Sequence, residues 1–170
     1  MTILGIEQIT YGASDLDTCR RCFTDWGLTL TAETKGRLTF ESLNGCRVVV
    51  ADPKQEPLPS AMEDGPTLRE VTWGVKDSAS LRALRDRLAA MQAPGLEDGD
   101  DSVGCIDPNG LAIRFGVSAK RTVQLEGTRT NTWDRADRVD RPATIYSHAT
   151  PIDVGHLGFF VKELAATEAF

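Results

Sequence analysis

Three stretches of the chain follow one pattern of residue types, and this internal repeat limits the possible folds more than any other feature. They begin at Gln8, Glu70 and His156 and read QITYGASDL, EVTWGVKDS and HLGFFVKEL. In each stretch an aromatic residue stands three places after the first residue, and an acidic residue stands seven places after it. Alternating apolar residues predict a strand, and the acidic residue stands where a helix would begin. We therefore expect three copies of a strand that leads into a helix.

The first two copies are each followed by further strands. Helices are expected over 16–26 and 78–91, because capping residues precede them and apolar residues recur within the second at helical spacing. Strands are expected over 3–13, 28–33, 37–43, 47–51, 67–75, 102–106 and 111–117, with turns such as Asn44-Gly45 between them. Residues 1–117 are thus predicted to hold two units of similar design that stack on each other.

The third copy lacks the strands that follow the other two. A helix is expected to begin near Leu164, and the sequence given stops at Phe170. An apolar strand without partners leaves backbone groups unpaired. We expect an N-terminal fragment of a longer protein, in which residues 153–170 begin a second module. The alternative is that this strand completes another chain by exchange.

Residues 118–152, between the second and third copies, are rich in charges of both signs, which is typical of a solvated connector. An alternative is that Asn131-Thr132-Trp133 folds over the second module and lines its mouth. His148 lies in this connector, outside the strand register, and is not expected to be a ligand.

Charge and cysteine content exclude several classes of function. The chain carries a net charge of −6 with no basic stripe, which disfavours nucleic acid or an anionic membrane as a partner. No apolar run is long enough to span a bilayer, and the first residues do not resemble a secretory signal, so a cytoplasmic protein is expected. Cys19 and Cys22 form a Cys-x-x-Cys pair without a second pair at matching spacing. They are interpreted as reduced thiols rather than as a zinc site.

The two tandem units, with the turn Asp107-Pro108-Asn109-Gly110 before the last strand of the second, resemble the vicinal oxygen chelate superfamily. That group includes glyoxalase I, bleomycin-resistance proteins and extradiol ring-cleaving dioxygenases. The resemblance covers 3–117 as one module and 154–170 as the start of another. It implies an α+β fold in which paired βαβββ units form a curled mixed sheet around a divalent metal.

The resemblance also indicates where metal ligands would lie. In the first module these places fall at Gln8, approximately Val49, Glu70 and Arg114. Valine offers no ligand atom and arginine repels a cation, so this module is expected to be metal-free. His156 matches the first ligand of a second module, and the other ligands would lie beyond Phe170. Imidazole suits Fe(II), with Mn, Zn or Ni as alternatives.

These features predict the first part of a two-module Fe(II) dioxygenase that cleaves a small aromatic diol with O2. Its first module would be structural, and a homo-oligomer is expected. The fragment itself is expected to bind no metal and to be inactive. One alternative is a glyoxalase-like lyase or isomerase. Another is a metal-free small-molecule binding protein of the bleomycin-resistance type.

Overall fold

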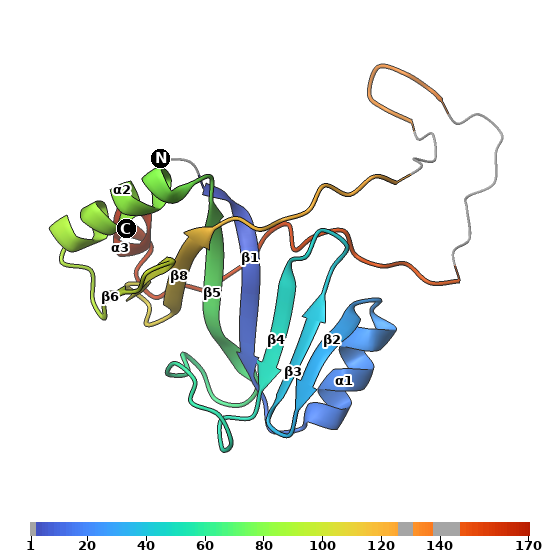
Figure 1. Ribbon diagram of the computed structural model, residues 1–170, viewed down its shortest axis with the longest axis horizontal. Helices are drawn as coiled ribbons and strands as arrows, with labels where there is room; N and C mark the ends of the chain where they lie inside the picture. The colour runs from blue at the N-terminus through green and yellow to red at the C-terminus, as the bar shows by residue number, and fades with distance from the viewer. Residues whose placement is uncertain (1–2, 126–130, 138–146) are drawn as a thin grey trace.

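A single twisted sheet built from two similar halves dominates the computed structural model, which describes residues 3–125, 131–137 and 147–170 (Figure 1). The first half comprises β1 (Ile3–Gly12), α1 (Leu16–Asp25), β2 (Thr29–Thr34), β3 (Arg37–Glu41) and β4 (Arg47–Ala51). The second comprises β5 (Thr67–Val75), α2 (Ser78–Ala90), β6 (Glu97–Asp98), β7 (Ser102–Ile106) and β8 (Ala112–Val117). The only other helix in the described residues is α3 (Leu164–Ala169).

Both long helices begin where the acidic residue of each repeat predicts. The Asp15 carboxylate accepts a hydrogen bond from the Thr18 amide (3.0 Å), and Asp77 does the same for Ser80 (2.7 Å). These contacts satisfy amides that have no partner inside the helix. Gly27 follows α1 with a φ of +100°, which residues with a Cβ rarely adopt. Local capping therefore sets the limits of the helices.

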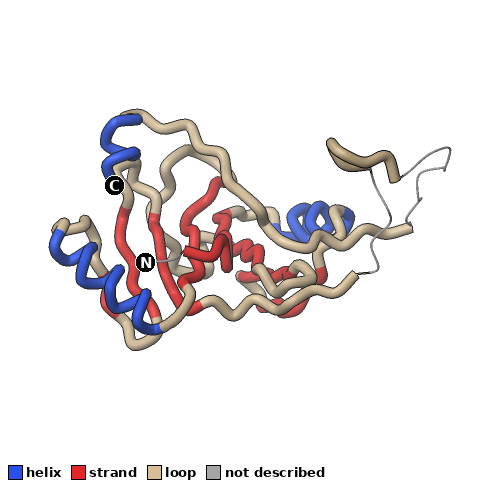
Figure 2. Tube along the Cα trace, turned by 90° about the horizontal axis from the view of Figure 1, so that it is seen from above, coloured by secondary structure: helices blue, strands red, loops and turns tan. Residues whose placement is uncertain are grey.

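The sheet joins the two halves through its central strands. Its order is β2-β3-β4-β1-β5-β8-β7-β6, and it is not closed into a barrel. β1 pairs with β4 in parallel, β5 pairs with β8 in parallel, and β1 and β5 meet in antiparallel register at the centre. Figure 2 shows the twist of this sheet along its length. The predicted α+β fold, with paired βαβββ units in a curled mixed sheet, is confirmed.

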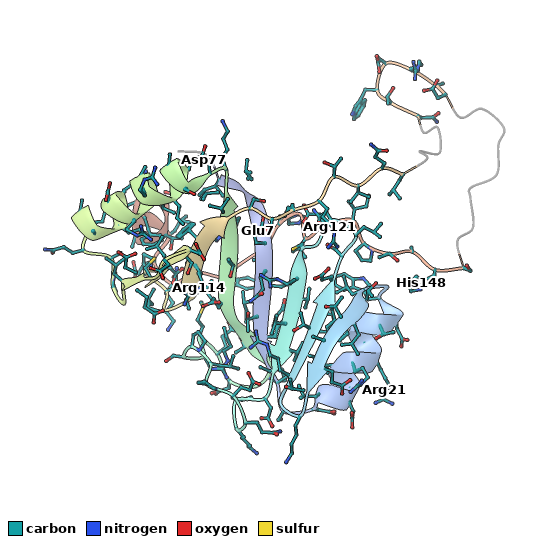
Figure 3. All side chains as sticks on the ribbon, viewed as in Figure 1. Glu7, Arg21, Asp77, Arg114, Arg121 and His148 are labelled. Carbon is teal, nitrogen blue, oxygen red and sulfur yellow. The ribbon has the colours of Figure 1, made fainter. Side chains whose placement is uncertain are left out.

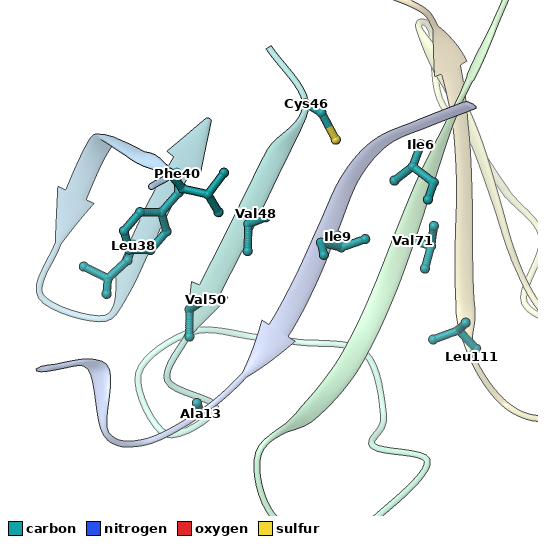
Figure 4. Packing of buried hydrophobic residues seen from close by; sticks show 11 residues of the cluster. Ile6, Ile9, Ala13, Leu38, Phe40, Cys46, Val48, Val50, Val71 and Leu111 are labelled. Carbon is teal, nitrogen blue, oxygen red and sulfur yellow. The ribbon is translucent and has the colours of Figure 1, made fainter. Parts of the chain in front are cut away.

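Both helices and nearly all of the apolar core lie on one face of the sheet, here called the helix face. Side chains of the first half, such as Phe40, Val48 and Ile9, pack together beneath α1 (Figure 4). A second cluster packs beneath α2, and Trp73 and Ile113 contact both clusters. The two clusters are therefore continuous, and the opposite face of the sheet is left for polar side chains.

The strand predicted for the third copy of the repeat is not formed. Residues 147–163 form no strand, although α3 begins at Leu164 as the sequence predicts. A strand needs a neighbouring strand for its hydrogen bonds, and this segment finds none among the described residues. It instead runs along the helix face, where Val154 and Leu157 pack against the first core cluster.

Part of the predicted connector falls outside the description. Residues 126–130 and 138–146 of 118–152 are not among the described residues. Within the described part, Thr132 and Arg135 form an isolated bridge, and Trp133 is fully exposed. No helix in the described ranges combines the length and the apolar character needed to cross a bilayer.

Candidate functional site

The face of the sheet opposite the helices encloses a cavity of about 820 Å³, here called the cup. Strands β1, β5, β7 and β8 form its floor, and the proline-rich loop 52–66 borders it. Its polar lining includes Gln8, Thr10, Arg37, Glu70, Glu97 and Arg114. The cup combines this volume with a charged and polar lining, and it is the candidate functional site.

Strand alternation explains why these side chains point into the cup. Ile9 faces the core, so its neighbours Gln8 and Thr10 face the opposite side of β1. The Gln8 amide donates a hydrogen bond to the Thr10 hydroxyl (3.1 Å). Val49 is the register partner of Thr10 on β4, but its side chain is buried and apolar.

Arg114 lies on β8 (Figure 3), and its guanidinium lies between two glutamates in the cup. Its Nε is 3.3 Å from a carboxylate oxygen of Glu70, and its Nη2 is 3.0 Å from one of Glu97. Nη1 lies 3.4 Å from the Ser102 hydroxyl. The Glu70 side chain is only 16% exposed, so its charge needs this partner.

Electrostatics keep this arginine charged. Burial alone would lower the pKa of the Arg114 guanidinium. The hydrogen bond to Glu97 and the nearby charge of Glu70 outweigh burial and raise the pKa above its ordinary value. Arg114 therefore supplies the cup with a permanent positive charge that forms ion pairs with two carboxylates.

The path from Glu97 to Arg114 crosses a glycine. Glu97 pairs with Gly104, and Gly104 pairs in turn with Arg114 on the next strand. A Cβ on Gly104 would lie 3.4 Å from the guanidinium, so the arginine lies directly over this residue as it crosses β7. Sequence reasoning missed Glu97, because only the short pairing of β6 brings that acidic turn to the cup.

The loop 52–66 is tied to the sheet on the other side of the cup. Arg37 pairs with Glu56 (3.4 Å), and Arg69 donates a hydrogen bond to the carbonyl of Pro59 (3.2 Å). At the start of the loop, Asp52 accepts hydrogen bonds from the Gln55 side chain and the Lys54 amide, which lower the pKa of its carboxyl. Neither Arg37 nor Arg69 was identified from the sequence as a residue of the site.

The residues of the cup do not fit a divalent cation. Gln8, Glu70 and Arg114 line the same cavity, as the resemblance implies, but the guanidinium takes the carboxylate that a metal would need. The guanidinium of Arg114 and a metal cation would also repel each other. Within the described residues, no three His, Cys, Asp or Glu side chains lie close enough to hold a metal.

His156 lies outside the cup, in the exposed segment on the helix face. The described part of the chain brings no cluster of further ligands to it. His148 is exposed near α1, far along the sheet from Arg114 (Figure 3). All four cysteines are free. The metal role of His156 stays a prediction.

Solved structures with the same fold include a Mn(II)-bound glyoxalase and homoprotocatechuate 2,3-dioxygenases. The Mn(II)-bound glyoxalase from Novosphingobium aromaticivorans is 18% identical, with a TM-score of 0.52, over 72% of this chain and 42% of that one. Homoprotocatechuate 2,3-dioxygenase from Brevibacterium fuscum, in complex with 3,4-dihydroxyphenylacetate, is 16% identical, with a TM-score of 0.55, over 71% and 38%. The enzyme of that name from Arthrobacter globiformis is 18% identical, with a TM-score of 0.53, over 68% and 36%.

The likeness is one of fold. No protein-family model matches the sequence, and no curated protein matches it either. The chain spans less than half the length of the structures it resembles. The predicted resemblance to the glyoxalase and extradiol dioxygenase fold is thus confirmed at the level of structure.

Proposed function

We propose that the chain is the metal-free first module of a two-module, extradiol-type Fe(II) dioxygenase. The observation that carries this proposal is the position of Arg114 between Glu70 and Glu97, where the resemblance would place a metal. A module with this cup contributes structure rather than redox chemistry. The matched part of the chain covers only 36–38% of the extradiol dioxygenases, and this supports a second module.

In this proposal the metal site belongs to the second module, and His156 is its first ligand. The remaining ligands follow later in the full protein. Its substrate is a small aromatic diol that is cleaved with O2 in the cytoplasm, and the enzyme is a homo-oligomer. The residues described here then act as the scaffold against which that module packs.

Two other functions share the same fold. The Mn(II)-bound glyoxalase supports a lyase or isomerase whose metal site also lies in the second module. The cup itself supports a metal-free binding protein, because its cavity of about 820 Å³ combines apolar Leu58 with hydrogen-bonding Gln8 and Thr10. Ring cleavage, isomerisation and simple binding are distinguished by assaying the full-length protein.

The test is to purify the full-length protein under anaerobic conditions and measure its metal content and catechol cleavage. One metal ion per chain is expected. His156→Ala should lower metal retention about tenfold or more, since even changes outside the ligand sphere cost that much. His148→Ala is the matched control and should retain the metal. A full-length protein that contains no metal, or that keeps it in the His156→Ala variant, would contradict the proposal.

A further inference from the structure

The segment 149–163, here called the strap, crosses the helix face between the two halves of the sheet. In Figure 1 it passes from the region above α1, behind β1 and β5, to α3. The proposed function does not account for these contacts, because it assigns most of the strap to a second module.

The first anchor of the strap is the turn between β3 and β4. The carbonyls of Pro151 and Ile152 accept hydrogen bonds from the amides of Leu43 and Asn44, at 3.0 Å each. Two successive backbone bonds of this kind fix the direction of the strap as well as its position. The contact therefore selects an extended backbone.

A charge pair between a largely buried lysine and a more exposed aspartate strengthens this anchor. Asp153 accepts hydrogen bonds from the Lys120 ammonium at 2.8 and 2.9 Å, and the Lys120 side chain is only 17% exposed. Val154, the next residue, packs against the core cluster that contains Cys46. Cys46 is fully buried, so the strap contributes to shielding it from solvent.

The second anchor is Asn109, in the turn that the sequence singled out. Its side-chain oxygen accepts a hydrogen bond from the Lys162 amide (3.2 Å). Its side-chain nitrogen donates to the Thr167 hydroxyl in α3 (3.0 Å). Phe170, at the end of α3, packs against the second core cluster. One asparagine thus holds the strap and the helix that follows it.

Between the anchors the strap is unpaired. Among the described residues, the backbone groups of 155–161 form no hydrogen bond with another backbone group. Phe159 is 44% exposed and Phe160 is 98% exposed. This stretch has the alternating pattern of a strand and belongs to the third copy of the repeat. An unpaired apolar strand tends to pair with any open sheet edge.

We propose that the helix face is a holding site for the strap, which leaves it to become a strand of the second module. The two anchors keep an aggregation-prone segment in place until its partner strands are available. The released state rests on the proposed function, because it needs a second module. The docked state rests only on the contacts described above.

Docking is tested in the 170-residue chain through Cys46. In a variant that has Cys46 as its single cysteine (Cys19→Ser, Cys22→Ser, Cys105→Ala), the rate of reaction with a thiol reagent reports exposure. Lys120→Met removes the charge but keeps the carbon stem. It should speed labelling about tenfold, the factor expected for one charge-assisted contact.

The matched control is Lys35→Met, which removes an exposed lysine from the turn before β3. Its labelling rate should equal that of the parent. Thermal unfolding followed by circular dichroism shows whether Lys120→Met loosens only the strap or the whole fold. The docked state is refuted if Cys46 reacts as fast as an unfolded thiol, or if Lys120→Met leaves its rate unchanged.

Release is tested by hydrogen exchange at residues 155–161. These amides should exchange rapidly in the 170-residue chain and at least about tenfold more slowly in the full-length protein, where they are paired. Equal rates in an active full-length dioxygenase would overturn release and leave the proposed function intact. A full-length protein without metal or activity would refute the proposed function, whereas the Cys46 result would still decide docking.

Discussion

Arg114 acts in the cup as a positive charge that is part of the chain itself. A metal ion and a guanidinium both neutralise carboxylates, but the guanidinium needs only hydrogen-bonding partners. Its contacts with Glu70 and Glu97 join β8 to β5 and to β6, which is separated from β8 by β7. We therefore assign Arg114 a role in stability.

This role predicts a coupled loss of stability. Arg114→Met should lower the free energy of unfolding by about 1–3 kcal/mol, because it leaves the half-buried Glu70 charge without a partner. Most of that cost belongs to Glu70, since the contact with exposed Glu97 is screened by water. Urea unfolding at 25 °C measures the effect.

The double variant provides the control. Glu70→Gln in the Arg114→Met background should recover part of the loss, so that the two substitutions are not additive. Strictly additive effects would show that the pair contributes no coupling energy. They would leave the position of Arg114 without a stabilising role.

For single residues, the sequence predicted which positions lie on strands, but it did not predict the ion pairs between their side chains. The family resemblance indicated Gln8, Glu70 and Arg114 as neighbouring positions, and all three line the cup. Alternation along each strand, which is a local property, sets the side to which each side chain points. The contact between Glu97 and Arg114 could not be predicted, since it depends on the pairing of β6 with β7 and of β7 with β8. The partner of a charged residue depends on tertiary structure.

The helices show how far local signals reach. α1 and α2 begin at the capped positions that the repeat predicts, because an aspartate cap acts within three residues of chain. The strand predicted at the third copy is absent, although its residues follow the same pattern. A cap is satisfied locally, whereas a strand requires a neighbour that this segment lacks among the described residues.

The cap of α2 predicts a pH-dependent stability. The Ser80 amide, through its hydrogen bond, lowers the pKa of the Asp77 carboxyl below its ordinary value. The folded state therefore binds the proton less tightly than the unfolded state does. The stabilisation is present above the ordinary pKa of aspartate, about 3.9, and is lost as the pH falls through the lowered value.

Asp77→Ala should accordingly lower the Tm at pH 7 by about 2–4 °C. The difference from the parent should shrink as the pH falls below about 4 and the carboxyl is protonated. Asp77→Asn is the matched control, because asparagine also caps helices but does not titrate. Its Tm should stay close to that of the parent at pH 7. An unchanged Tm for Asp77→Ala would argue against the cap.

At the scale of the whole molecule, the two faces of the sheet have different structural roles. The helix face carries the continuous core, both long helices and the strap, so it determines stability. The cup face carries the polar cavity, with its charges already paired. The sheet and its two units were predicted from the sequence, but the strap was not. Its first anchor joins residues that are more than a hundred positions apart, such as Leu43 and Pro151.

This division predicts that the 170-residue chain with Fe(II) does not cleave catechols. The cup repels a cation through Arg114, and His156 has no cluster of further ligands in the described residues. The measurement is O2 uptake and formation of the ring-opened product, with anaerobic equilibrium dialysis to determine iron binding. Arg114→Glu is the informative comparison: it places a third carboxylate beside Glu70 and Glu97 and should increase binding of divalent cations. Stoichiometric iron binding and turnover by the unchanged chain would show that the first module has its own metal site.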